Sequence, residues 1–249
     1  MTESIARVEI KYLLPLAQAE ALEAGLRQRG FTRSDYGSPR VQSLYYDTEN
    51  YDLIRASLER PGYKEKLRLR AYGEGGGITR SFLEIKKKFN GVVYKRRTEM
   101  PLAEAAEGLR RGRLPETAGQ VGREVEWMLR RYGLRPAAAI AYDRDAWLRP
   151  EEPEVRITFD RNLTFRDWDL DLNSRDPGVR LIRPDQRLME IKTGGVYPLW
   201  LTRLLQETGA VRTHFSKYGE AYLRYIRPEK EGIERSGAKC SIASLLRGA

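Results

Sequence analysis

Histidine and cysteine are almost absent from this sequence: its 249 residues include one of each, His214 and Cys240. A single cysteine excludes an intramolecular disulfide and a cysteine-rich zinc site, and it fits a reducing compartment. A single histidine excludes mechanisms that need paired or clustered histidines. Any catalysis would therefore rest mainly on lysine, arginine, aspartate and glutamate.

Long apolar runs are also missing. No window approaches the roughly 20 apolar residues that a membrane-spanning helix needs, and the first residues lack a signal peptide pattern. We therefore expect a cytoplasmic protein without a membrane span. Negative charge is scarce as well, because 45 lysines and arginines stand against 35 aspartates and glutamates, a net charge of +10. The partner is expected to be an anion.

What the sequence does contain is strands in which charged and apolar residues alternate. In residues 63–72, Lys66, Arg68 and Arg70 share one face while Leu67 and Leu69 share the other. Further strands are predicted over residues 5–14, 41–46, 81–88, 92–100, 137–148, 154–160 and 188–192. Helices are predicted from Pro15 to Gly30, with Ala17, Ala21, Leu22 and Leu26 on one face, over 102–111, 119–132 and 199–207, and after a Ser216 cap.

The charged faces of these strands are mostly basic. An ordinary solvated sheet explains any single strand, but like charges on paired strands repel, and desolvating them inside a barrel is costly. A polyphosphate chain would compensate them. The basic residues expected on one inner face are Lys11, Lys66, Arg68, Arg70, Lys86, Lys88, Lys95, Arg97, Arg144, Arg156 and Lys192.

Three glutamates stand two residues before a lysine, which places both side chains on one face of a strand. Such a glutamate can hold a hard divalent metal while the lysine binds a phosphate oxygen. The alternative is an ion pair that only reduces repulsion. The pairs are Glu9 with Lys11, Glu84 with Lys86, and Glu190 with Lys192.

Eight short motifs in order resemble the VTC domain, the polyphosphate polymerase domain of the vacuolar transporter chaperone complex, which belongs to the triphosphate tunnel metalloenzymes. They lie at residues 7–12, 66–72, 82–88, 94–97, 142–147, 155–160, 188–192 and 215–218. The resemblance implies an α+β fold in which an antiparallel β tunnel barrel carries its helices outside. We expect this domain over residues 1–227 and a flexible tail over 228–249.

The resemblance also implies an activity: growth of inorganic polyphosphate from the γ-phosphate of ATP, with Mn²⁺ or Mg²⁺. By motif position, Glu190 would bind the metal, with Glu9 and Glu84 as further candidates from the pattern above. The residues expected to act on phosphates in catalysis are Arg68, Arg70, Lys86, Arg144 and Arg156. Those expected to bind phosphates are Lys11, Lys95, Arg97, Lys192, Ser216 and Lys217, the last two at a helix N-terminus.

Two departures from related families affect this prediction. The tunnel hydrolases and cyclases begin with Glu-x-Glu-x-Lys, whereas Arg7 occupies the first glutamate position here. The fungal polymerase subunits carry an inositol-phosphate sensing domain and membrane helices that this sequence lacks, so we expect a stand-alone domain of bacterial type. The alternatives are a triphosphate or polyphosphate hydrolase and a non-catalytic polyanion-binding module; nucleic-acid binding is not expected.

Overall fold

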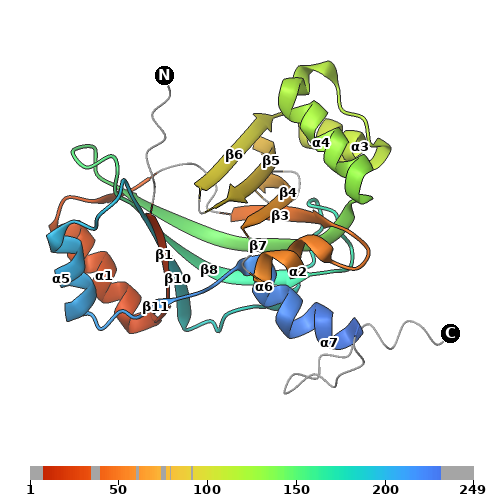
Figure 1. The fold of residues 1–249 in the computed structure, drawn as a ribbon. Coiled ribbons are helices and arrows are strands. Elements are labelled where there is room, and N and C mark those ends of the chain that lie inside the picture. Colours follow the sequence, from red (N-terminus) through yellow and green to blue (C-terminus); the bar gives the residue numbers. More distant parts are fainter. Residues whose placement is uncertain are drawn as a thin grey trace.

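The computed structural model describes residues 8–34, 40–59, 62–73, 77–78, 80–90 and 92–230. Its strands form one antiparallel sheet, with helices packed against both of its faces (Figure 1). The strands are β1 Val8–Pro15, β2 Thr32–Arg33, β3 Arg40–Asp47, β4 Tyr63–Tyr72, β5 Arg80–Phe89, β6 Val92–Glu99, β7 Arg135–Leu148, β8 Arg156–Arg166, β9 Val179–Arg180, β10 Gln186–Thr193 and β11 Arg212–Thr213. The helices are α1 Leu16–Gln28, α2 Asp52–Leu58, α3 Leu102–Arg111, a 3₁₀ turn Glu116–Ala118, α4 Gly119–Tyr132, α5 Leu199–Glu207, α6 Lys217–Ala221, a π-helical turn Tyr222–Ile226 and α7 Arg227–Lys230.

The sheet has two ends. Its strands pair in the order β11-β1-β10-β8-β7-β3-β4-β5-β6, with β2 and β9 as side branches. Among the strands that the structure describes, β6 and β11 do not pair to complete a ring. The predicted α+β class and the antiparallel pairing are confirmed, but the sheet curls without closing into a hydrogen-bonded barrel.

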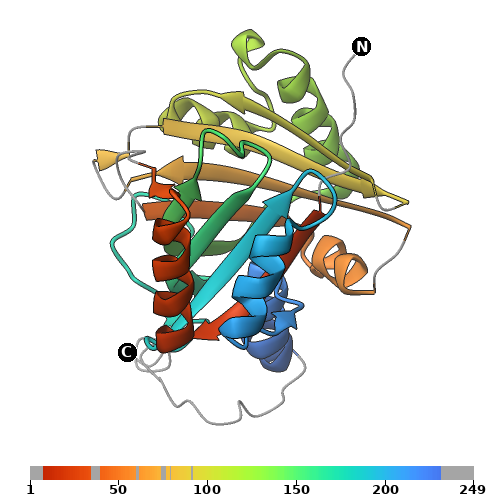
Figure 2. The same cartoon turned by 90° about the vertical axis from the view of Figure 1, so that its left-hand side faces the viewer.

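The curl brings distant strands across from one another. In Figure 2, β4, β5 and β6 pass over β1, β8 and β10, so that one face of the sheet is concave. We call this concave side the inner face. The helices α3 and α4 contact the outer side of β4, β5 and β6, and α1 and α5 cover the outer side of β1 and β10.

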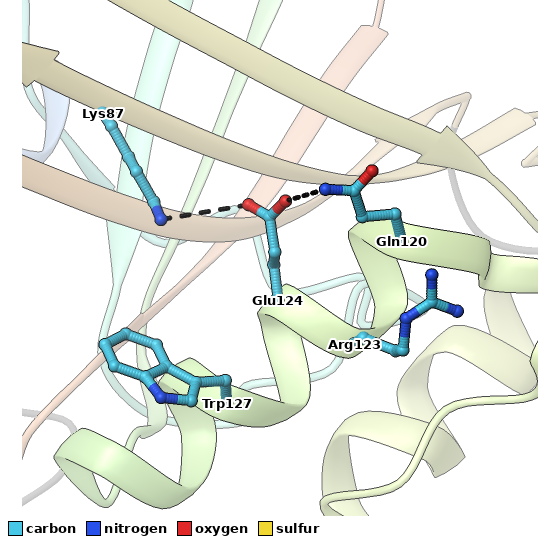
Figure 3. Close-up of a pocket in the computed structure, with 5 residues that line it drawn as sticks. All are labelled: Lys87, Gln120, Arg123, Glu124 and Trp127. Carbon is cyan, nitrogen blue, oxygen red and sulfur yellow. Dashed lines mark hydrogen bonds and ion pairs between the residues drawn. The ribbon is translucent and has the colours of Figure 1, made fainter.

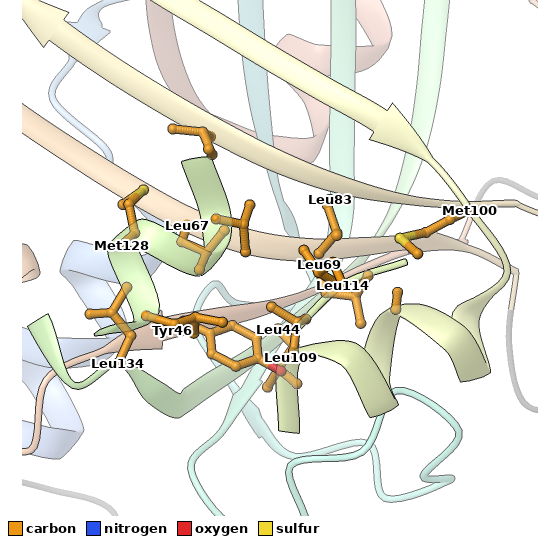
Figure 4. Close-up of a cluster of buried hydrophobic side chains, with 14 of the residues drawn as sticks. Leu44, Tyr46, Leu67, Leu69, Leu83, Met100, Leu109, Leu114, Met128 and Leu134 are labelled. Carbon is orange, nitrogen blue, oxygen red and sulfur yellow. The ribbon is translucent and has the colours of Figure 1, made fainter. Parts of the chain in front are cut away.

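Apolar residues of the alternating strands form the contacts with these outer helices. On β4 and β5, Leu67, Leu69 and Leu83 pack against Leu109 and Met128 of α3 and α4 (Figure 4). A second cluster joins α1 and α5 to the outer faces of β1, β8 and β10. Because side chains alternate along a strand, burial of these apolar residues directs the charged residues to the inner face.

A third apolar cluster lies on the inner face itself. Tyr218 of α6 stacks on Tyr45 of β3 with ring centroids 4.9 Å apart, and both pack with Leu163 and Leu188. The C-terminal helices therefore fill one end of the concave side. The charged residues of β1, β4, β5, β6 and β10 lie toward the other end of the concave side.

Several predicted boundaries match the structure, including β4, α3, α4 and α5. The helix predicted over residues 119–132 ends before Gly133, which is the left-handed C-cap of α4 with φ of 61°, a conformation that glycine adopts without strain. The predicted face of α1 was right for Leu22 and Leu26 but wrong for Ala17 and Ala21, which are exposed. The buried residues of α1 are Ala19, Leu22, Gly25 and Leu26, which pack beneath α5 and the sheet.

The C-terminal prediction is corrected in part. Residues 228–230 belong to α7 and not to a tail. The rest of the predicted tail, with Cys240, lies outside the described residues. The same holds for Arg7 and for residues 74–76 and 91. No helix in the described ranges combines the length and apolar character required to cross a membrane.

Candidate functional site

The first group of predicted residues gathers around Glu84 of β5. Its carboxylate lies 2.6 Å from Nε of Arg68, 3.6 Å from Nε of Arg70 and 2.7 Å from Nζ of Lys95. These partners come from β4 and β6, the two neighbours of β5 in the sheet. We call Glu84, Arg68, Arg70 and Lys95 the Glu84 cluster.

Among the described residues, Glu84 thus pairs with arginines and a lysine of adjacent strands and not with Lys86, the partner predicted from the spacing. Its side chain is only 2% exposed. Burial raises the pKa of the Glu84 carboxyl, but Arg68, Arg70 and Lys95 outweigh burial and hold this pKa at about 2. The carboxylate therefore stays charged and fixes the guanidinium of Arg68, which also donates to the hydroxyl of Tyr45.

This depressed pKa predicts a pH dependence of folding. Because the folded-state pKa of Glu84 is lowered, its stabilisation is complete above the unfolded-state value of about 4.5 and is lost as the pH falls toward about 2. We expect Glu84→Gln to be less stable than the wild type near pH 6, with the difference shrinking near pH 3. Urea unfolding at several pH values measures this. A difference independent of pH would contradict the assignment.

The second group gathers around Glu190 of β10. Nζ of Lys217 lies 2.7 Å from both Glu190 and Asp160. The guanidinium of Arg144 makes two hydrogen bonds to Asp160, of 2.6 and 2.7 Å, and lies 3.4 Å from Glu190. Nζ of Lys11 lies 3.5 Å from Glu190. We call these five residues the Glu190 cluster.

The Glu190 cluster sets three cations against two carboxylates, and its members Glu190, Asp160 and Lys217 are buried. Burial opposes the charge of Glu190, but Lys217, Lys11 and Arg144 hold the pKa of its carboxyl well below the usual range. Burial likewise opposes the charge of Lys217, yet Asp160 and Glu190 keep the pKa of its ammonium above its ordinary value. The sequence placed Lys217 at an anion-binding helix N-terminus, whereas the structure commits its ammonium to two carboxylates.

The Glu84 cluster and the Glu190 cluster lie on opposite sides of the concave inner face. Glu9 of β1 lies 3.5 Å from Lys11 and 3.7 Å from Lys192, and the charge of Lys86 on β5 contributes to the lowered pKa of Glu9. Burial lowers the pKa of Lys66 to about 8, and the positive charges of both Lys86 and Lys11 also lower it. Since β5 and β1 are far apart in the strand order, these interactions cross the concave side.

Other predicted residues keep more exposure. Lys86, Arg97 and Arg156 are exposed, and Lys192 is half-buried. Arg156 lies opposite Lys192 in the pairing of β8 with β10, and Arg97 stacks on Phe82 with its guanidinium 4.8 Å from the ring centre. Ser216 accepts a hydrogen bond from the backbone N–H of Gly219 and so caps α6 as predicted.

The carboxylates suit a metal that arrives with phosphates. The described residues contain no group of three or more histidine, cysteine, aspartate or glutamate side chains arranged to hold a metal ion. Glu9 and Glu190 nevertheless share Lys11 between them. Mg²⁺ is commonly bound by one or two carboxylates together with substrate phosphates. These two residues fit that donor set, whereas Glu84 lies in the separate Glu84 cluster.

Three residues of the site were not selected from the sequence. Asp160 is fully buried and bridges Arg144 and Lys217. Tyr142 lies under both of these cations, 5.0 and 4.7 Å from its ring centre. Tyr45 contacts Arg68, and although burial raises its pKa, Arg68, Arg70 and Lys66 lower it to about 8. A signal for Asp160 does exist in the sequence, because alternation along residues 154–160 puts it on the same face of the strand as Arg156.

The sequence of this chain is similar to that of a known protein domain. A family model described as the VTC domain matches residues 6–226. Subunit 2 of the vacuolar transporter chaperone complex of Saccharomyces cerevisiae is 25% identical over 191 residues, and subunit 4 from Schizosaccharomyces pombe is 24% identical over 158. These alignments cover 66% and 54% of this chain but only 22% and 21% of the fungal proteins.

A solved structure from Bacillus halodurans, described as a candidate adenylate cyclase, has the same fold. Its TM-score is 0.50 at 12% sequence identity, and the match covers 85% of this chain and 95% of that one. At this identity the likeness concerns the fold alone. The match of the family model over most of the sequence is what assigns the family: the chain belongs to the VTC domain family.

Proposed function

We propose that this protein is a metal-dependent polyphosphate polymerase, which transfers the γ-phosphate of ATP to a growing inorganic polyphosphate chain. The observation that carries the proposal is the concave face on which the Glu84 and Glu190 clusters fix arginines and lysines from five separate elements. Membership of the VTC domain family supports it. A cytoplasmic location remains a prediction.

The two clusters suit the electrostatic demands of phosphoryl transfer. Arg68 and Arg70 present planar guanidinium groups that match phosphate oxygens, and Glu84 holds them in place before substrate binds. Lys86, Lys192 and Arg156 add charges that are free to turn toward phosphates because these side chains retain exposure. Such preorganised cations stabilise the charge that develops on the transferred phosphoryl group.

The proposed reaction needs no covalent enzyme intermediate. An oxygen of the terminal phosphate of polyphosphate bonds to the γ-phosphorus of ATP while the bond from that phosphorus to the bridging oxygen breaks, and ADP leaves. Lys11 and Arg144, which keep some exposure, would align the phosphates along the β1 and β10 wall, and Lys217 would hold Glu190 in place. Mn²⁺ or Mg²⁺, held by Glu190 and Glu9, would supply neutralisation of phosphate charge.

Incubation with ATP and Mn²⁺ tests the reaction, with the products separated on a gel that resolves polyphosphate. Chains longer than triphosphate are expected, together with ADP. Release of orthophosphate alone would instead identify a hydrolase. Binding of polyphosphate without turnover of ATP or of triphosphate would identify a polyanion-binding module.

Two adjacent lysines of β5 offer a matched test of the inner face. Lys86 faces Glu9 and Lys192, whereas Lys87 points outward to Glu124 of α4 at 3.9 Å (Figure 3). We expect Lys86→Ala to reduce the rate of synthesis by about 10-fold or more, because a charge-assisted bond to phosphate is lost. Lys87→Ala should leave synthesis nearly unchanged. Equal effects of the two variants on rate would contradict the assignment of the inner face.

A further inference from the structure

A separate pocket lies at the opposite end of β1 from Glu9. It has a volume of about 450 Å³ and is bounded by the end of β9, the turn before β10, residues 213–215 and the π-helical turn. We call it the Arg180 pocket. Its size falls within the range of small-molecule sites.

The charged lining of the Arg180 pocket is predominantly basic. Arg180, Arg183 and Arg224 line it together with His214, and Glu220 is its one acidic lining residue. Arg183 is paired with Asp185 at 3.0 Å, and Arg224 donates to the carbonyl oxygen of Leu181 at 2.6 Å. These contacts fix two of the guanidinium groups without cancelling the excess of positive charge.

The chemistry of the pocket wall suits a phosphate. Burial raises the pKa of the Glu220 carboxyl and outweighs the charge of Arg224, which lowers it. Arginine is suited to phosphate because its planar donors match the spacing of phosphate oxygens. Apolar side chains, including Leu13 and Phe215, complete the wall.

The backbone around Arg224 is unusual. Arg224 lies in the π-helical turn Tyr222–Ile226, and such turns are rare and are frequently found at functional sites. The pocket is distinct from the Glu190 cluster but adjoins it. Phe215 lines the pocket, and its carbonyl oxygen accepts a hydrogen bond of 3.0 Å from Nζ of Lys11.

We propose that the Arg180 pocket binds a small phosphate-bearing anion, at a second site separate from the inner face. The ligand class follows from the three arginines, and its small size follows from the volume of the pocket. The phosphate could belong to an inorganic anion or to an organic phosphate ester. Pyrophosphate and AMP represent these two sources.

Hydrogen–deuterium exchange of the full-length protein tests the proposal, with residues 179–186 as the reporter segment. We expect pyrophosphate, AMP or both to slow exchange in this segment. Arg180→Glu should raise the ligand concentration needed for half-maximal protection by about tenfold or more. Arg183→Glu provides a second variant should the first fail to fold. Arg203→Glu, an exposed arginine on α5, is the control and should leave the protection unchanged.

A variant of the inner face separates this result from the proposed polymerase activity. In Arg68→Ala, protection of residues 179–186 should persist even if synthesis is lost, because Arg68 belongs to the Glu84 cluster. Protection by pyrophosphate alone indicates an inorganic ligand, and protection by AMP alone an organic one. The proposal is overturned if neither anion changes exchange in this segment, or if protection survives both arginine substitutions in folded protein.

Discussion

Glu190→Gln is expected to destabilise the fold by about 3–5 kcal/mol, the typical cost of breaking a buried ion pair from one side. The substitution nearly preserves volume but leaves Lys217 and Arg144 with Asp160 as their remaining charged partner in the cluster. Lys217 is buried and cannot recover hydration easily. Urea unfolding monitored by circular dichroism measures the loss, and polyphosphate synthesis should fall with it because Lys11 and Lys217 lose a fixed anchor.

The pH dependence of this difference identifies its cause. The folded-state pKa of Glu190 is depressed, so its stabilisation is complete above the unfolded-state value of about 4.5 and declines as the pH falls below it. The difference between wild type and Glu190→Gln should therefore shrink in acid. Glu107→Gln is the matched control, since Glu107 forms exposed pairs with Arg110 and Arg111 on α3.

A second variant, Lys217→Met, measures directly how strongly Lys217 and Glu190 interact. Lys217→Met removes the buried ammonium, and in the double variant with Glu190→Gln neither partner of this pair remains charged. The double variant should lose less stability than the sum of the single losses, because the two side chains interact directly. Strict additivity, or a loss no greater than that of Glu107→Gln, would show that the Glu190 cluster does not stabilise the fold as described.

Arg68→Ala is expected to lower the rate of polyphosphate synthesis by roughly 100-fold or more, the typical effect of removing one preorganised donor to a developing negative charge. Arg68 is held by Glu84 and by the hydroxyl of Tyr45, so its guanidinium needs little reorganisation to meet a phosphate. Initial rates at saturating ATP, together with ATP binding by calorimetry, separate loss of rate from loss of affinity.

Two companion variants make the result for Arg68 specific. Arg68→Lys keeps the charge but loses the planar pair of donors, and it should recover only part of the rate. Arg96→Ala removes an arginine of β6 that pairs with Glu124 of α4 on the outer side, and it should retain synthesis. Folded Arg68→Ala with the wild-type rate would exclude Arg68 from the proposed reaction.

The strands were predictable because their pattern is local. Alternation of charged and apolar residues depends only on neighbours in sequence, and it placed β4 at residues 63–72, as the structure does. It also placed Arg68 and Arg70 on the charged face, opposite Leu67 and Leu69. The face of α1 was less predictable, because which stripe is buried depends on how closely α5 approaches Gly25.

The partners of each charged side chain could not be read from the sequence. Spacing paired Glu84 with Lys86, but pairing of β5 with β4 and β6 brings Arg68 and Lys95 to the carboxylate of Glu84. Asp160 joins Glu190 because β8 pairs with β10. Such cross-strand neighbours are set by register and strand order, which no single strand encodes.

The Glu190 cluster also bears on the order in which the chain can fold. Lys11 belongs to the first described strand and Lys217 to a helix near the end of the described chain, yet both contact the same carboxylate. Contacts between residues so distant in sequence form late and slow folding. A nascent chain that has not yet released α6 from the ribosome would hold Asp160 and Glu190 without Lys217, so the Glu190 cluster can be completed only after α6 has emerged.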